Sequence, residues 1–316
     1  MLSPAVTRMV GTVGVMVSFD EGHDLLQGLA GVDVTTKNVE RAAEALGREI
    51  ADDERRAPQR PSTDEPITPT MYLGMDGTGV PMRTSELKGR EGKQPDDTPS
   101  DFAARAMREA TRRDFDRAPR RVVLGDGAPW IWNLADVYFR GAIQIVDRFH
   151  VKQHLSDVSK SIYGAGSELS AQWARKRHDE LDAGDIEAIL AALRIHAPKD
   201  HQARKCVEYI DGNRERMRYP EFRAAGLCTS TGVVEAGCKV AIGTRCKRSG
   251  MHWTVQGVDA IIALRCCKLR GLLGAPVSSQ GTRRVTSMKY LAMRGPGRVK
   301  WGPSPWPSPR SRGARG

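Results

Sequence analysis

The sequence contains no apolar run long enough to cross a membrane. No stretch in the 316 residues approaches the roughly 18 apolar residues of a transmembrane helix. The opening stretch, MLSPAVTRMVGTVGVMVSFDEG, has a short apolar run that glycine interrupts, which is unlike a secretory signal. We therefore expect a cytoplasmic protein with no membrane partner.

The sequence also lacks a Cys-x-x-Cys pair, although it has six cysteines. Without that spacing and without a secretory signal, the cysteines do not indicate a disulfide framework or a zinc ribbon. We expect reduced, buried thiols in a cytosolic protein.

Acidic residues are missing from residues 271–316, a segment that contains nine Lys and Arg residues. Because the whole chain carries a net charge of +11, residues 1–270 carry only +2 by subtraction. A basic excess suggests a polyanionic partner. Here most of the excess belongs to a segment rich in Pro, Gly, Ser and Arg, which we expect to be disordered.

Shifts in composition divide the rest of the chain, whose length suits one large or two ordinary domains. We predict a helical, helix-turn-helix-like region at 1–56, a Pro-rich linker at 57–70, the first part of an α/β core at 71–150, a helical insertion at 151–228, final core helices at 229–270 and a disordered basic tail at 271–316.

Two helices are predicted within residues 20–56. The stretch EGHDLLQGLAG ends at Gly31, a typical helix C-terminus. The stretch TTKNVERAAEALGREIADDER then puts apolar residues on one helical face: Val39, Ala42, Ala43, Leu46 and Ile50. A DNA-binding helix-turn-helix and a plain helical hairpin fit this pattern equally well, and the second helix has as many acids as bases.

Three acids share a suggestive context. Asp76 follows a predicted strand at 71–75, Asp126 is the acid at which a second short apolar strand in RRVVLGDGA (120–128) ends, and GAIQIVDRFH (141–150) is predicted as a third strand. Glu235 lies near the start of a helix that Ser230 can cap. Together the carboxylates could converge on two Mg²⁺ ions, which need oxygen ligands and, about 4 Å apart, promote phosphoryl transfer. For each acid taken alone, a turn or a solvated surface position is the favoured interpretation.

Four longer stretches carry a family resemblance. These are MDGTGVPM…KGREGKQ, RRVVLGDGAPWIWNLADVYFRGAIQIVDRFHVKQHL, NRERMRYPEFRAAGL and STGVVEAGCKVAIGTRCKRSGMHWTVQGVDAIIALRC. Together they resemble the DDE transposases of bacterial insertion sequences, specifically the ISKra-type family. The resemblance implies an α/β, RNase H-like fold whose mixed sheet is interrupted by a helical insertion.

The resemblance also implies a site and a reaction. Asp76, Asp126 and Glu235 take the DDE positions as catalytic residues and metal ligands. The implied cofactor is Mg²⁺, with Mn²⁺ as a substitute, and it supports in-line attack on phosphodiesters by water and then by a DNA 3′-hydroxyl. The implied partners are double-stranded DNA at the element ends and the target, with self-association on DNA and a nucleoid location.

The stretch DRFH, from Asp147 to His150, matches an Asp/Cys-x-x-His signature of the related Mutator-like group. His150 could contact DNA or order the metal site, although we favour a hydrogen-bonded histidine at a strand–helix junction. His150 and His154 are also four residues apart, as in some zinc sites, but no Glu or Cys completes such a site.

Basic and aromatic side chains near the acids are further candidates for DNA contacts. Four basic residues could bind phosphates or form a solvated helix face: Lys239, Arg245, Lys247 and Arg248. Three tryptophans could stack on bases, but we favour buried packing for each: Trp130, Trp132 and Trp253.

Two departures from the family pattern stand out. Residues 94–118 show no strand pattern where the family supplies two strands and a helix, so we infer an internal loss that leaves the sheet incomplete. The resemblance ends near Cys267 and Lys268, and the tail resembles out-of-frame translation. Three hypotheses stay open: a degenerate transposase, a non-catalytic DNA-binding remnant, and a product that folds poorly.

Overall fold

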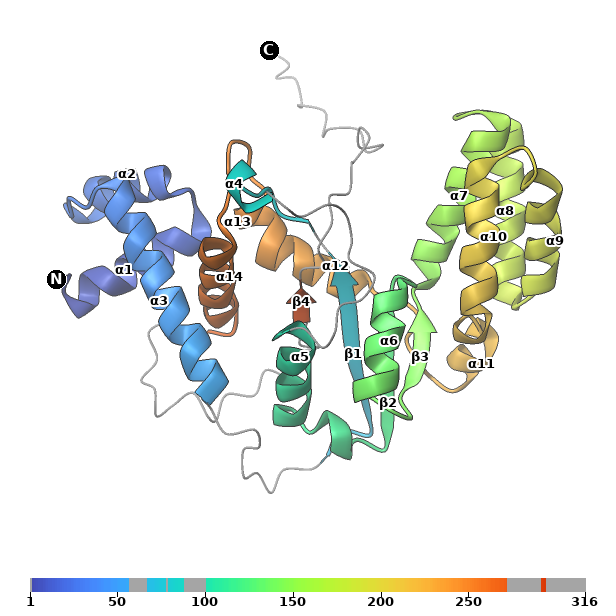
Figure 1. The fold of residues 1–316 in the computed structure, drawn as a ribbon, viewed down its shortest axis with the longest axis horizontal. Coiled ribbons are helices and arrows are strands. Elements are labelled where there is room, and N and C mark those ends of the chain that lie inside the picture. The colour runs from blue at the N-terminus through green and yellow to red at the C-terminus, as the bar shows by residue number, and fades with distance from the viewer. Residues whose placement is uncertain (1, 57–66, 78, 88–100, 272–290, 294–316) are drawn as a thin grey trace, which may run out of the picture.

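The computed structural model describes residues 2–56, 67–77, 79–87, 101–271 and 291–293. Most of the predicted linker and of the predicted tail lies outside these residues. The described part is a mostly helical α/β structure around one small sheet (Figure 1). None of its helices combines the length and the apolar character that a membrane crossing demands.

The sheet is built from the three strands that the sequence predicts: β1 (Thr70–Gly77), β2 (Arg120–Gly125) and β3 (Ile143–Val146). Their order is β3-β2-β1, and the short β4 (Leu291–Met293) pairs with the other edge of β1. Every pairing among the described strands is parallel. The expected mixed sheet is therefore not seen, because the segment between β1 and β2 contributes no antiparallel strand to the described structure.

Helices make the crossovers that parallel strands require. The described residues between β1 and β2 form α4 (Thr84–Leu87), α5 (Asp101–Arg112) and the 3₁₀ turn η1 (Phe115–Arg117), with no strand, as residues 94–118 predict. Between β2 and β3 lies α6 (Pro129–Tyr138), which begins with the predicted proline in its first turn. Figure 1 shows α5 and α6 on the same side of the sheet.

Residues 148–224 form a compact helical group, shown at the right of Figure 1. Its elements are α7 (Arg148–Tyr163), α8 (Glu168–Ala183), α9 (Ile186–His196), α10 (His201–Asn213), η2 (Arg214–Arg216) and α11 (Tyr219–Ala224). Apolar side chains of this group and of the sheet share one core, in which Leu155, Leu190 and Ile210 are fully buried. The prediction that residues 151–228 are helical is confirmed.

A second core joins the first three helices to the last described helices. It contains side chains from α1 (Pro4–Met16), α2 (Phe19–Ala30), α3 (Thr36–Arg56), the π-helical η3 (Lys239–Gly243), α13 (Thr244–Cys246) and α14 (Val255–Leu269). Figure 1 shows α14 alongside α3, where Val39 packs in the same cluster as Val258. Residues 1–56 and 229–270, which the sequence analysis separates, therefore share one core.

The N-terminal helices end as their sequences predict. Gly31 stops α2 in the left-handed region, with φ 61°, and its amide donates to the Gln27 carbonyl. At the other end Ser18 and Glu21 form a reciprocal capping box. The predicted apolar face of α3 is confirmed, since Val39 and Ala43 are fully buried.

An ion-pair cluster connects the second core with α5. Arg270, just after α14, bonds Glu54 of α3 at 2.8 Å and Glu109 of α5 at 3.2 Å. Burial opposes ionisation of Glu109, but Arg113 and Arg270 lower its pKa below the ordinary value. The cluster therefore fixes α5, which covers the sheet, against the helices that carry the chain ends.

Candidate active site

The carboxyl ends of the three main strands carry a row of aspartates. In the sheet register Met75 lies opposite Gly125, and Gly125 lies opposite Val146. Continuing this register by one residue places Asp76, Asp126 and Asp147 side by side, one per strand. Clefts at this edge of parallel sheets are common ligand sites.

Asp126 opens a tight turn between β2 and α6. Its carboxylate accepts a hydrogen bond from the Ala128 amide at 2.9 Å, which leaves its other oxygen free of the turn. Gly127 has φ 93°, a conformation that glycine adopts without strain. The backbone carbonyl of Asp126 accepts a hydrogen bond of 2.7 Å from the Tyr209 hydroxyl of α10.

Asp76 lies close enough to Asp126 for the two charges to interact. Burial and the Asp126 carboxylate raise the pKa of Asp76, while hydrogen bonds from the Cys238 thiol and the Gly77 amide, and the charge of His150, oppose that shift. A buried carboxyl whose pKa is raised, and which has a second carboxylate close by, is a candidate functional residue.

Asp147 has a different role, because both of its oxygens are occupied. Its side chain is 4% exposed and accepts bonds from the amides of Phe149 and His150, at 2.6 and 3.2 Å. The other oxygen accepts bonds from both the amide and the hydroxyl of Thr231. Asp147 therefore ties the start of α7 to the segment that leads into α12.

The helix α12 (Gly232–Cys238) lies across the carboxyl end of the sheet. Thr231, just before it, binds Asp147 at the end of β3, and Cys238, its last residue, binds Asp76 at the end of β1. Glu235 lies on this helix between the two attachments, although its side chain is outside what the structure describes. The π-helical η3 follows directly; π-helical segments often occur at functional sites.

Two histidines of α7 border the acids. The His150 and His154 rings meet edge to face, with their centroids 4.9 Å apart. The centroid of the His154 ring lies 4.5 Å from that of the Tyr209 ring. Burial, with His150 nearby, lowers the pKa of His154 to about 4, so it is neutral at pH 7. His150 lies at the junction of β3 and α7, where its backbone amide donates to the Asp147 carboxylate.

The four predicted phosphate-binding residues do not form one face. Lys239 and Lys247 are exposed. Arg245 is fully buried, its guanidinium lying over the Phe19 and Trp253 rings at 4.6 and 5.1 Å, so its predicted surface role is not seen. Arg248 forms a two-pronged ion pair with Glu21, at 2.6 and 2.8 Å. The two arginines do not join a phosphate-binding face because their side chains contact α1 and α2, which are far away in sequence.

The predicted packing of the tryptophans is confirmed for two of them. Trp132 and Trp253 are each 5% exposed. Trp130 is half-buried and meets the Phe102 ring edge to face at 5.5 Å. Trp132 and Trp253 are therefore too buried to stack on a base.

The chemistry of the acid pair suits a hard cation. Asp76 and Asp126 offer carboxylate oxygens, the ligand type that Mg²⁺ prefers. In the described part of the chain, no group of three or more His, Cys, Asp or Glu side chains is arranged to hold a metal ion. Two carboxylates fit a Mg²⁺ site that water, substrate phosphates or a further acid completes.

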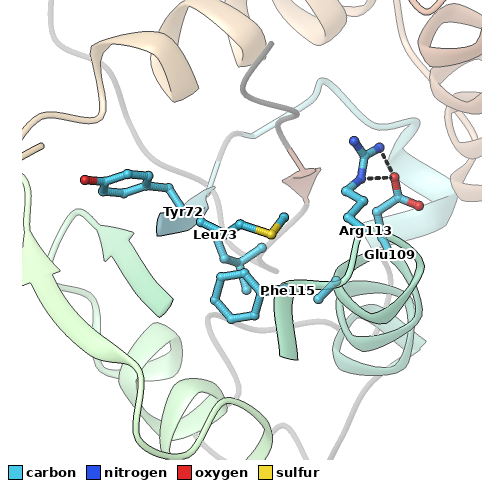
Figure 2. A pocket seen from close by; sticks show the side chains of 7 residues that line it. Tyr72, Leu73, Glu109, Arg113 and Phe115 are labelled. Carbon is cyan, nitrogen blue, oxygen red and sulfur yellow. Dashed lines mark hydrogen bonds and ion pairs between the residues drawn. The ribbon is translucent and has the colours of Figure 1, made fainter. Parts of the chain in front are cut away.

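A small pocket lies at the opposite end of β1 (Figure 2). Its lining comes from β1, α5 and the following turn: Met71, Tyr72, Leu73, Glu109, Ala110, Arg113 and Phe115. Figure 2 shows the Glu109–Arg113 pair, whose Nε bond is 2.6 Å, at one side of it. About 30 Å³ of free volume holds little more than a water molecule, so this pocket is no substrate site.

Sequence reasoning missed three residues that support the acids: Thr231, Tyr209 and Asn213. Tyr209 and Asn213 share the buried face of α10 with Cys206 and Ile210. The signal was present, since two polar residues at i and i+4 interrupt an otherwise apolar stripe. What the pattern could not tell is that this stripe faces the turn of Asp126.

Comparisons with known proteins give one family match. Residues 94–280, more than half of the chain, match a family described as Uncharacterised protein family (UPF0236). The matched range includes Asp126 and Glu235 and begins after Asp76. No curated protein matches the chain.

Proposed function

The chain belongs to the uncharacterised protein family UPF0236, and from that premise we propose that it is a DDE-type transposase by descent. In this proposal the protein cleaves DNA strands at the ends of its element and joins them to target DNA, with Mg²⁺ as cofactor. The family occurs among transposase-like proteins, which favours this proposal over an unrelated hydrolase.

One observation carries the proposal: Asp76 and Asp126 lie at the carboxyl ends of adjacent parallel strands, next to a helix that bears Glu235. The interaction between the two carboxylates helps raise the pKa of Asp76. The residue before this helix binds Asp147, and the last residue of the helix binds Asp76 itself. Two acids from strand ends and one from a crossing helix are the parts that the DDE resemblance requires.

Each residue then has a role that its surroundings support. Asp76 and Asp126 would hold Mg²⁺ through their carboxylates, and Glu235 would complete the set. Bound Mg²⁺ would supply a lower pKa for an attacking water and charge stabilisation at the phosphorus. Asp147 would position α12 through its bonds to Thr231. His154, being neutral, would add no positive charge near the cation.

We also propose that the sheet is a reduced RNase H-like sheet. The parallel order β3-β2-β1 retains the strands that carry the first two acids, and the chain passes from β1 to β2 through α5. The two strands expected between the first two acids would be the ones lost. The short β4 would occupy part of the edge that they leave on β1.

A cleavage assay tests the proposal. Purified protein is incubated with a DNA duplex that carries the sequence flanking the gene, in Mg²⁺ and then in Ca²⁺. We expect strand cleavage in Mg²⁺ only, abolished by Asp126→Ala. Asp136→Ala is the matched control, since Asp136 is an exposed acid on α6 that accepts a bond from Gln144, away from the site. Equal cleavage by wild type and Asp126→Ala would reject catalysis at these acids.

The alternative is a catalytically inactive, transposase-derived protein that only binds DNA. In the described residues, the edge of β1 where the expected strands would lie pairs only with the three-residue β4, which favours this alternative. Salt-dependent DNA binding with no cleavage in either Mg²⁺ or Mn²⁺ would support it. Absence of binding at low salt would reject it together with the enzymatic proposal.

A further inference from the structure

We propose that the helical insertion braces the catalytic turn: Tyr209 and Asn213 of α10 are positioning residues for the Asp126 carboxylate. The turn in question is Asp126–Ala128. The bracing is a contact within this chain, while its consequence for cation binding rests on the proposed function.

Two side chains of α10 hold the two peptide carbonyls of the turn. The Tyr209 hydroxyl donates to the Asp126 carbonyl at 2.7 Å, and the Asn213 amide donates to the Gly127 carbonyl at 3.4 Å. The same Asn213 nitrogen donates to the Tyr209 carbonyl at 2.9 Å, which keeps it on its own helix. These contacts bridge more than 80 positions of sequence.

The turn and the Tyr209 ring fit closely. A Cβ at Gly127 would lie 2.5 Å from a ring carbon of Tyr209 and 2.6 Å from its hydroxyl oxygen. Glycine at this position therefore satisfies both the backbone angle, φ 93°, and the approach of the ring. The Tyr209 ring also packs against the His154 ring, with the two ring centroids 4.5 Å apart.

Bracing the carbonyls also fixes the carboxylate. The Asp126 side chain bonds the Ala128 amide, at the far end of the same turn, at 2.9 Å. A change in the turn would therefore move both the donor and the acceptor of that bond. Cation sites lose affinity when ligands are displaced by about half an ångström, so the side chains of α10 act on cation binding without touching the cation.

The test uses the full chain and two readouts. The first is hydrogen exchange of the Ala128 amide, read by NMR, which reports on the carboxylate without any metal. The second is the dissociation constant of Mn²⁺ alone, measured by water-proton relaxation. Tyr209→Phe removes only the hydroxyl. Tyr163→Phe is the matched control, because its hydroxyl bonds His196 within the helical group.

We expect Tyr209→Phe to speed exchange at Ala128 about five-fold, the equivalent of one lost hydrogen bond. Mn²⁺ binding should weaken by a similar factor, while Tyr163→Phe matches wild type in both readouts. Asn213→Ala, a second variant that removes a different bond to the same turn, should shift both readouts in the same direction.

The outcomes separate the inference from the proposed function. Unchanged exchange in both Tyr209→Phe and Asn213→Ala would overturn the bracing. Faster exchange with unchanged Mn²⁺ affinity would overturn the positioning role. Mn²⁺ binding that survives Asp126→Ala would reject the proposed cation site and the positioning role with it, and the exchange data alone would then decide the bracing.

Discussion

At the scale of single residues, Gly47 determines how closely α3 and α14 approach. A Cβ at this position would lie 2.1 Å from the carbonyl oxygen of Ala260 and 2.5 Å from its carbonyl carbon, both backbone atoms of α14. Backbone cannot move aside as a flexible side chain can, so Gly47→Ala must push the helices apart. We expect the free energy of unfolding to fall by roughly 1–3 kcal/mol, measured by urea denaturation.

Gly28→Ala is the matched control for that change. Gly28 is exposed on α2, and no atom lies within 4 Å of a Cβ built there. Alanine is the better helix former, so this variant should be unchanged or more stable by up to about 1 kcal/mol. If Gly47→Ala and Gly28→Ala unfold at the same urea concentration, the result would contradict the close backbone contact between α3 and α14.

Arg245 and Lys239 separate a structural cation from a surface one. Arg245 donates to the Gly14 carbonyl at 2.8 Å, and its guanidinium lies over the Phe19 and Trp253 rings. Arg245→Ala leaves a cavity and removes the donor of a buried carbonyl, so we expect a loss of about 2–4 kcal/mol in unfolding free energy. Chemical denaturation measures this loss.

Lys239→Ala should show the opposite pattern. Lys239 is exposed, so its removal should change the unfolding free energy by no more than about 0.5 kcal/mol. Under the proposed function it should weaken DNA binding and reduce the slope of affinity against salt by about 1. A DNA-binding defect in Arg245→Ala without any loss of stability would restore Arg245 as a phosphate contact.

The contrast between the acids and Arg245 shows what a sequence reveals about a site. The sequence predicts Asp76 and Asp126 because each follows a strand, and the end of a strand can be recognised from the residues around it. Arg245 looked like one more basic residue, since its partner Gly14 lies 231 positions earlier. Tyr209 was missed for the same reason. Local pattern places a residue on an element, but it does not say what the element touches.

At the scale of elements, the three main strands and most helices follow from local periodicity, whereas the helix pairing does not. The apolar stripe of α3 was predicted correctly, but its partner α14 is about 200 residues away. Whether two strands pair parallel or antiparallel could also not be predicted, because the sequence of one strand does not indicate which strand it pairs with. The parallel pairing of β1 with β2 became visible only in the sheet register.

The contact between α2 and the end of α13 should depend on pH through Glu21. Its hydrogen bond to Arg248, with those from Ser18, lowers the pKa of Glu21 from 4.5 to about 2. A carboxyl whose folded pKa is depressed stabilises the protein above the unfolded pKa and loses that contribution as pH falls. The stability difference between wild type and Glu21→Gln should therefore be constant above about pH 4.5 and shrink toward pH 2.

Glu21 also caps α2, and glutamine at this position retains part of that role. The Arg248→Ala background separates the ion pair from the cap. Without Arg248 the largest cause of the depressed pKa is gone, so Glu21→Gln in that background should give a smaller difference with a weaker pH dependence. Thermal unfolding in buffers from pH 2 to 7 measures both. A difference that stays constant across the whole range would contradict the ion pair.

At the scale of the whole molecule, the first three helices pack against the last described helices. Val15, Leu26 and Val39 from the first helices pack with Ile242, Val258 and Ile261 from the last. Arg265 adds hydrogen bonds to the Val15 and Val240 carbonyls. The sequence predicts residues 1–56 and 229–270 as separate regions, because the Pro-rich stretch and the α/β core lie between them. In the folded chain these two regions bury their apolar faces against each other.

Shared burial predicts that residues 57–316 do not fold independently. Removing α1 to α3 exposes the apolar faces of η3 and α14, including Ile242 and Ile261, which are fully buried in the intact chain. We expect this shortened chain to bind a hydrophobic dye and to melt without a sharp transition. Adding residues 1–56 as a separate peptide should restore a cooperative melt, and the same peptide with Val39→Asp should not, because Val39 is fully buried in that core. A sharp melt of 57–316 alone would show that the N-terminal helices form a separable domain.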